Sequence, residues 1–384
     1  MSANRLILAL ALLAAPAAAQ TDPVAATAAR IKTFPAMTSI ENEAAYQPAE
    51  TVKGQPRAIA VATASGISSA ALLDAQAYAE SMQSFAFVVL RDGKLVHEYY
   101  APGFGRANRF SPASMHKTVM ALAFGTARIP LDAPVKRWLT EWTNDPRGNI
   151  TVRQLLTMES GLETPPFGTD PASKSSQLMF GSDIVSTALS FAPVTAPGSV
   201  FSYLNANSQL AGIILQRATG KRYAEYLSRT IWRPIGASDA TVWLDRPMGT
   251  AHFFCCLQAS ALDYARIGQL ILDGGRVGRR QVVPVDWVSE MARPSALNPN
   301  YGLQLWRGSP YTAVRRYSAL SPLVGRAAKP YLRDDVLFMD GAIGQRVYVV
   351  PSERLVIVRI GKSTMAWDDS ELPNRVLAGI AAQK

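Results

Sequence analysis

The chain carries β-strand patterns near both ends and helical patterns between them, and this order restricts its possible folds more than any other feature. Residues 85–90 and 95–100 are rich in β-branched and aromatic side chains and meet at Asp92-Gly93, which predicts a hairpin. Residues 346–350 and 355–360 form a similar pair across a short turn. The order predicts one antiparallel sheet built from both chain ends, with a helical region inserted between them.

We therefore expect an α+β fold, an α/β sandwich in which helices flank the sheet. The sheet region would span about 67–113 and 250–384, and a mostly helical insert would span about 114–249. The spacing of apolar residues, the capping residues at helix starts and the glycines at helix ends predict the individual helices. They are expected at 69–82, 151–158, 208–218, 223–232, 259–273 and 371–381.

Residues 1–19 have the pattern of a secretory signal peptide. Arg5 supplies the positive start, residues 6–15 the apolar segment, and Ala17-Ala18-Ala19 a small-residue cleavage site. No other stretch is apolar and long enough to span a bilayer. We expect a protein exported to the periplasm, with residues 20–384 as one mature domain and no integral membrane segment.

Charge and histidine content exclude several classes of partner. The formal net charge is +10, but the 39 Lys and Arg residues are scattered, without the clustering of a nucleic-acid surface. Only three histidines occur, with no carboxylate at ligand spacing, so we expect no metal and no other cofactor. The sequence does not indicate the oligomeric state.

The only two cysteines, Cys255 and Cys256, are adjacent. Neighbouring cysteines cannot close a loop, and a vicinal disulfide between them is an uncommon arrangement. We expect two buried thiols in an apolar run, and a fold that is held by its core.

Ser114 and Lys117 stand three residues apart, immediately before an apolar segment. If a helix begins at Ser114, both side chains lie on one face of it. An amine beside a hydroxyl activates serine without a His–Asp pair, and the helix start offers N–H groups to a developing oxyanion. On these residues alone, a helix cap at Ser114 and a solvated Lys117 are the favoured explanation, because a Ser and a Lys three residues apart are a weak pattern.

A second motif, Tyr203-Leu204-Asn205, follows a turn and precedes a helix. We expect a lysine ammonium near Tyr203 to lower the pKa of its phenol, which would suit it to move protons. The Asn205 amide would fix either Lys117 or a substrate carbonyl. The alternative is a buried tyrosine with a satisfied hydroxyl and an asparagine used in a cap.

Taken together, the two motifs resemble those of the serine β-lactamase and penicillin-binding protein superfamily. The resemblance is closest to its class C-like branch, which includes esterases, D-amino-acid peptidases and hydrolases of short nylon oligomers. It extends over residues 150–162, 197–212 and 224–236, and in all it runs from about 85 to 361, which is most of the mature chain. It implies that Ser114 is the acyl-accepting nucleophile, Lys117 its activating partner, Tyr203 a general base or proton shuttle, and Asn205 a positioning residue.

The third motif of that family departs from its pattern here. A Lys or His normally precedes a glycine on the strand before the last hairpin, whereas this chain reads Asp340-Gly341-Ala342-Ile343. We include these four residues in the substrate-binding set, together with His252, which lies in a segment that runs beside the cleft in this family. Because an acid replaces the cation that binds the carboxylate of penicillin-type substrates, the departure weakens the case for β-lactam hydrolysis. Arg346 nearby is a possible source of positive charge.

The sequence thus predicts an exported serine hydrolase that cleaves a small ester or amide through an acyl-enzyme on Ser114. A class C-like β-lactamase or D,D-peptidase is the alternative enzyme. From another class, the alternative is an inactive envelope binding module with the same fold. His116, inside the first motif, is expected to be a packing residue.

Overall fold

The computed structural model describes residues 22–34, 39–166, 168–319, 321 and 323–380. Its centre is a six-stranded antiparallel sheet with the strand order β3-β2-β14-β13-β12-β9. The strands are β2 (Ser84–Arg91), β3 (Lys94–Tyr100), β9 (Trp306–Arg307), β12 (Leu337–Gly341), β13 (Gln345–Val350) and β14 (Leu355–Gly361). The predicted signal peptide lies outside the described residues.

Both predicted hairpins are present, and they join the two ends of the chain. β2 pairs with β3, β13 pairs with β14, and β14 lies directly against β2, with Val358 opposite Val88. Every residue of β13 and β14 is buried. Central strands covered on both faces read as continuous apolar runs, which is why the sequence identified them. The expected α+β architecture is confirmed.

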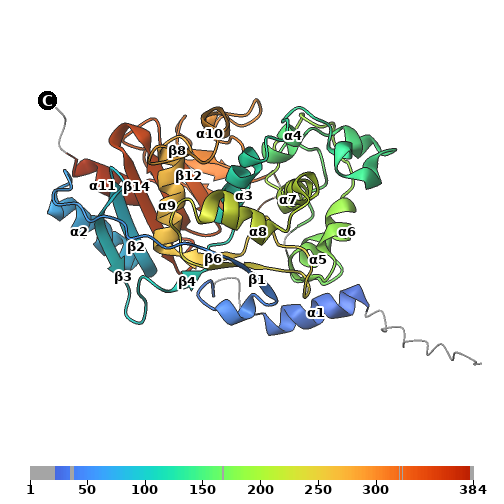
Figure 1. The fold of residues 1–384 in the computed structure, drawn as a ribbon, viewed down its shortest axis with the longest axis horizontal. Coiled ribbons are helices and arrows are strands. Elements are labelled where there is room, and N and C mark those ends of the chain that lie inside the picture. Colours follow the sequence, from blue (N-terminus) through green and yellow to red (C-terminus); the bar gives the residue numbers. More distant parts are fainter. Residues whose placement is uncertain (1–21, 35–38, 167, 320, 322, 381–384) are drawn as a thin grey trace, which may run out of the picture.

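Helices cover both faces of this sheet (Figure 1). α2 (Ser69–Ser81) and α11 (Glu371–Ala378) pack together on one side, and α9 (Ala261–Leu272) lies against β2, β13 and β14. Gly268 lets α9 approach closely, because a Cβ atom there would lie 2.6 Å from a Val356 methyl group. The three helices were predicted at nearly these bounds.

The helical region lies beside the sheet (Figure 1), and α3 runs between the two. α4 begins with a capping box, in which Thr151 and Gln154 bond each other's backbone N–H groups. The helices here are α3 (Met115–Thr126), α4 (Val152–Leu156), α5 (Lys174–Phe180), α6 (Ile184–Leu189), α7 (Asn205–Thr219) and α8 (Tyr223–Leu227).

A second sheet of four short strands was not predicted. Its order is β1-β5-β6-β4, and it pairs Ala49 near the start of the chain with Trp243. The strands are β1 (Ala49–Val52), β4 (Arg109–Phe110), β5 (Ala240–Trp243) and β6 (Leu257–Ser260). Through β1, the chain segment that precedes α2 pairs directly with β5.

The remaining elements lie around these two sheets. α1 (Pro23–Thr33) contacts α5, and α10 (Val285–Ala292) contacts α3. Two small hairpins consist of β7 (Arg276–Val277) with β8 (Arg280–Gln281), and of β10 (Val314–Arg316) with β11 (Val324–Arg326). Within the described ranges, no helix has the length and apolar character needed to cross a membrane.

Candidate active site

Ser114 stands at the first turn of α3, at the junction of the sheet and the helical region. The preceding residue, Ala113, has a φ of +50°, a backbone conformation that is uncommon for a residue with a Cβ atom. Gly341 at the end of β12 packs against this segment, because a Cβ atom on Gly341 would lie 2.2 Å from the Pro112 carbonyl oxygen. This close approach brings the β12–β13 turn beside Ser114.

Lys117 follows one helical turn later and points back at Ser114, as the spacing predicted. Its Nζ lies 2.8 Å from Ser114 Oγ, 2.9 Å from Asn205 Oδ1 and 2.9 Å from the Phe254 carbonyl oxygen. Asn205 is the first residue of α7, so two helix starts and one loop carbonyl meet at the lysine. The structure therefore assigns the Asn205 amide oxygen to Lys117.

The Lys117 amine is buried, and no carboxylate among the residues that the structure describes is in contact with it. Its side chain is 1% exposed, and its three hydrogen-bond partners are all uncharged. Burial lowers the pKa of Lys117 to about 7, because desolvation disfavours the ammonium, and the more distant Asp340 only partly opposes this. A substantial fraction of the lysine is thus a neutral amine near pH 7, and a neutral amine accepts a proton from a neighbouring hydroxyl.

Tyr203 lies over the same lysine, but its pKa moves opposite to our expectation. Lys117 Nζ is 4.7 Å from the centre of the Tyr203 ring. Burial raises the pKa of the Tyr203 phenol, the charge of Asp340 raises it further, and a hydrogen bond with Ser114 only partly opposes them. The prediction of a lowered phenol pKa is therefore wrong. A neutral phenol acts as a proton donor.

The cysteine prediction is also wrong, because Cys255 and Cys256 form a vicinal disulfide. The bridge follows Phe254, whose carbonyl oxygen accepts from Lys117, and the Cys255 carbonyl oxygen contacts His116 Nδ1 at 2.6 Å. Both carbonyls turn toward α3. The disulfide thus constrains the loop that supplies one of the three partners of Lys117.

A cavity of about 540 Å³ opens at Ser114. It is lined by the expected Tyr203, Asn205, Asp340, Ala342 and Ile343, whereas the expected Gly341 is not one of its lining residues. Apolar side chains form another part of its wall, namely Leu178, Met179 and Phe191 from the helical region and Phe254 from the loop before β6. A cavity of this size accommodates a small substrate next to the serine.

Asp340 does not face the cavity as a free carboxylate. It lies 2.6 Å from Arg315 and 2.6 Å from Arg346, and the Tyr317 hydroxyl donates to it at 2.7 Å. Asp369 contacts the same two arginines at 2.8 Å and 2.7 Å. We call Arg315, Asp340, Arg346 and Asp369 the charge cluster.

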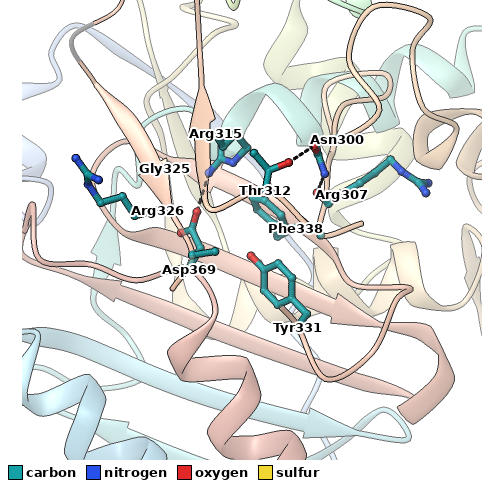
Figure 2. Close-up of a pocket in the computed structure, with 11 residues that line it drawn as sticks. Asn300, Arg307, Thr312, Arg315, Gly325, Arg326, Tyr331, Phe338 and Asp369 are labelled. Atoms are coloured by element: carbon teal, nitrogen blue, oxygen red, sulfur yellow. Dashed lines mark hydrogen bonds and ion pairs between the residues drawn. The ribbon is translucent and has the colours of Figure 1, made fainter. Parts of the chain in front are cut away.

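The charge cluster corrects the interpretation of the third motif. Arg346 does not restore a free positive charge, because Asp340 and Asp369 hold it, and its side chain is 2% exposed. Burial alone would lower the pKa of Arg346, but the two acids outweigh this effect and raise it. Figure 2 shows Arg315 reaching Asp369 beside a second, much smaller cavity, which Tyr331 and Phe338 help to line.

The two histidines near the site are held inside the protein. His252, expected in the substrate-binding set, is fully buried, and its ring nitrogens contact the carbonyl oxygens of Trp243 and Met179. It stacks on Trp243 behind the cavity wall and does not line the cavity. His116 is bonded to Cys255 and Tyr223, in agreement with a packing role.

Sequence reasoning missed several residues that shape the site. Arg315 and Tyr317 lie in a segment with little periodicity, Asp369 follows the last strand, and Phe254 contributes only its carbonyl group. No spacing in the sequence connects these residues to Ser114, because their contacts depend on the fold.

Residues 69–364 match the model of the beta-lactamase family. The chain belongs to that family. The resemblance inferred from the two motifs is thereby confirmed, and the matched range includes Ser114, Lys117, Tyr203 and Asn205.

Similar proteins agree with this family membership. A 6-aminohexanoate-dimer hydrolase from Paenarthrobacter ureafaciens is 29% identical over 221 residues, which is 54% of this chain and 56% of that protein. This alignment thus spans little more than half the length of the relative. A putative 6-aminohexanoate-dimer hydrolase from Bacillus anthracis has the same fold, with a TM-score of 0.69, 23% identity, and 89% and 91% of the two chains covered.

A D-stereospecific amidohydrolase from Streptomyces also shares the fold, with a TM-score of 0.57 and 20% identity. The similarity covers 82% of this chain and 100% of that one.

Proposed function

We propose that this protein is a serine hydrolase that cleaves a small amide or ester through an acyl-enzyme on Ser114. One observation carries the proposal: a buried lysine whose partners in the described part of the chain are all uncharged lies 2.8 Å from the serine hydroxyl, and its pKa is lowered to about 7. Family membership supports it, as do the relatives named as a 6-aminohexanoate-dimer hydrolase and a D-stereospecific amidohydrolase.

In this proposal, Lys117, Ser114 and Tyr203 each take a separate part in the reaction. The neutral Lys117 amine takes the Ser114 proton as the serine oxygen attacks the substrate carbonyl. The Ser114 N–H, at the positive end of α3, then stabilises the oxyanion. Tyr203, whose raised pKa keeps it protonated, donates a proton to the leaving group. Water then attacks the acyl carbon and gives a proton to the Tyr203 phenolate, and the Lys117 ammonium returns its proton to the Ser114 oxygen as the bond between that oxygen and the acyl group breaks.

Ester or amide substrates are favoured over β-lactams because the position before Gly341 holds an acid already paired with two arginines. We also propose that the protein is exported to the periplasm through residues 1–19. Cleavage after Ala19 during expression in a Gram-negative host, read from the mass of the periplasmic product, tests that part.

Intact-mass measurement after exposure to a fluorophosphonate tests the proposed function. We expect one adduct on the wild type and none on Ser114→Ala, followed by hydrolysis of p-nitrophenyl esters and anilides. Well-folded protein that forms no adduct would contradict the proposal and favour a binding module of the same fold. Faster turnover of a chromogenic cephalosporin than of any ester or amide would assign the chain to the β-lactamases.

A further inference from the structure

A second tyrosine, to which the proposed reaction assigns no part, lies directly against the proposed proton donor Tyr203. This residue, Tyr317, follows β10 and lines the active-site cavity together with Tyr203 and Ser114. The Tyr203 N–H donates to the Tyr317 carbonyl oxygen at 2.8 Å, although the two residues are far apart in the sequence. This bond fixes the backbone from which the Tyr203 side chain enters the cavity.

The rings of the two tyrosines are also in contact. Their centres lie 5.3 Å apart and their planes are tilted by 54°, within the range in which aromatic rings attract one another. Trp306 of β9 packs against both rings, with centres 5.6 Å from Tyr203 and 5.7 Å from Tyr317. The position of the Tyr203 phenol therefore depends on the position of the Tyr317 ring.

The hydroxyl group of Tyr317 is anchored on the charge cluster. It donates to Asp340 Oδ2 at 2.7 Å, and Arg315 lies 2.6 Å from the same oxygen. The Arg315 guanidinium also lies over the Tyr317 ring, 5.1 Å from its centre. Burial, and then the charge of Asp340, raise the pKa of the Tyr317 phenol, so it remains a donor at neutral pH. Because two arginines hold Asp340, the Tyr317 ring has a fixed anchor.

The same hydrogen bond provides Asp340 with a phenol other than that of Tyr203. The charge of Asp340 reaches Tyr203, since it raises the pKa of that phenol, whereas Tyr203 forms its hydrogen bond with Ser114. A carboxylate is a stronger acceptor than a serine hydroxyl, so a Tyr203 phenol that turned toward Asp340 would lose its bond with Ser114. Because Tyr317 donates to Asp340, the Tyr203 phenol is left to Ser114.

We propose that Tyr317 is a positioning residue, which holds the Tyr203 phenol at Ser114 so that its proton reaches the leaving group. This inference rests on the proposed function and adds a link between the charge cluster and the proton donor. The three hydrogen bonds of Lys117 go to Ser114, Asn205 and Phe254, so they do not involve Tyr317. Loss of the Tyr317 hydroxyl should therefore slow only the steps that need the Tyr203 proton.

Two substrates and a double-mutant cycle test this role. Tyr317→Phe keeps the ring and the backbone bond and removes only the hydroxyl group. We expect its kcat/KM to fall about tenfold for a p-nitroanilide, whose leaving amine needs a proton. The p-nitrophenyl ester of the same acid should lose less than about twofold, because nitrophenolate leaves without one. In the Tyr203→Phe protein, adding Tyr317→Phe should change the anilide rate by less than about twofold, since the group that Tyr317 positions is gone.

Tyr331→Phe is the matched control. Tyr331 lies near Asp369 of the charge cluster but lines the small cavity (Figure 2), and it is not a lining residue of the active-site cavity. Loss of its hydroxyl should leave both rates within about twofold of the wild type. Fluorophosphonate labelling of Tyr317→Phe at the wild-type rate would verify that this variant folds and that Ser114 and Lys117 keep their reactivity.

An unchanged anilide rate in Tyr317→Phe would overturn the proposal. Equal losses on anilide and ester, slower labelling, or an undiminished loss when Tyr203→Phe is already present would overturn it as well, because each would show an effect that does not pass through the Tyr203 proton.

A wild type that neither hydrolyses these substrates nor forms the fluorophosphonate adduct would contradict the proposed function instead. Crystal structures of the wild type and of Tyr317→Phe would then still decide the inference. We expect the Tyr203 hydroxyl beside Ser114 in the wild type and displaced from it in the variant. A Tyr203 side chain in the same place in both structures would show that Tyr317 does not position it.

Discussion

Two groups of buried cations lie within the same site, and their pKa values are shifted in opposite directions. Lys117 is surrounded by neutral oxygen atoms, and burial lowers its pKa to about 7. Arg315 and Arg346 are equally buried, but two carboxylates hold them and keep their pKa values raised. The comparison shows that the partner decides whether a buried cation becomes a base or remains a fixed charge.

Removing the base should have the largest effect. Lys117→Arg keeps a positive charge at the site but cannot lose its proton near neutral pH. We expect kcat/KM to fall by about a thousandfold or more, as is usual for loss of the activating base. Steady-state assays with a p-nitrophenyl ester would measure this. A variant that retains a tenth of the wild-type rate would show that another group takes the Ser114 proton.

Breaking the charge cluster should affect stability more than chemistry. Asp340→Asn leaves Arg315 and Arg346 with one carboxylate between them, and removing one partner of a buried ion pair costs about 3–5 kcal/mol. Urea denaturation would measure the loss in the free energy of unfolding.

Asp92→Asn is the matched control for this change. Its ion pair with Arg354 is exposed, so the expected loss is below about 1 kcal/mol. Equal losses for the two variants would refute the view that burial makes the cluster structural.

Tyr203→Phe would test whether Tyr203 donates the proton to the leaving group, as distinct from the role of Lys117 as the base. Without the phenol, an amine leaving group lacks its proton source, whereas nitrophenolate leaves without one. We expect kcat/KM to fall by about a hundredfold for an anilide and by about tenfold or less for a p-nitrophenyl ester. Tyr311→Phe, a change on the protein surface, should alter neither rate. Similar losses on both substrates would exclude a role in leaving-group protonation.

Reducing the disulfide should have the smallest effect. The Cys255–Cys256 bridge constrains the loop whose Phe254 carbonyl holds Lys117. We expect a phosphine reductant to lower the esterase rate by about threefold, in line with the loss of one well-placed hydrogen bond. The Cys255→Ala/Cys256→Ala variant should start at the lower rate and not respond. A wild-type rate unaffected by complete reduction, verified by mass, would show that the loop keeps its place unaided.

The sequence predicted the parts of this protein that depend on local pattern. The apolar runs of β13 and β14 and the helix that joins Ser114 to Lys117 follow from neighbouring residues. The role proposed for Tyr203 came from resemblance, and the structure places it over Lys117.

What the sequence did not predict depends on distant contacts. The second sheet pairs four-residue strands almost two hundred positions apart, as with Ala49 and Trp243. The raised pKa of Tyr203 reflects burial and Asp340, neither of which is visible in its own segment. The charge cluster joins residues from β10, β12, β13 and the segment before α11.

The pH dependence of fluorophosphonate labelling tests the central claim most directly, because it reports the reactivity of Ser114 without a leaving group that needs a proton. The folded protein lowers the pKa of Lys117 to about 7, so the amine is neutral above that pH and protonated below it. We predict a labelling rate that is constant above pH 8 and falls about tenfold per unit below pH 6, with one inflection near 7. A rate that keeps rising to pH 10 would mean that Lys117 has the pKa of an ordinary lysine, and would contradict the account.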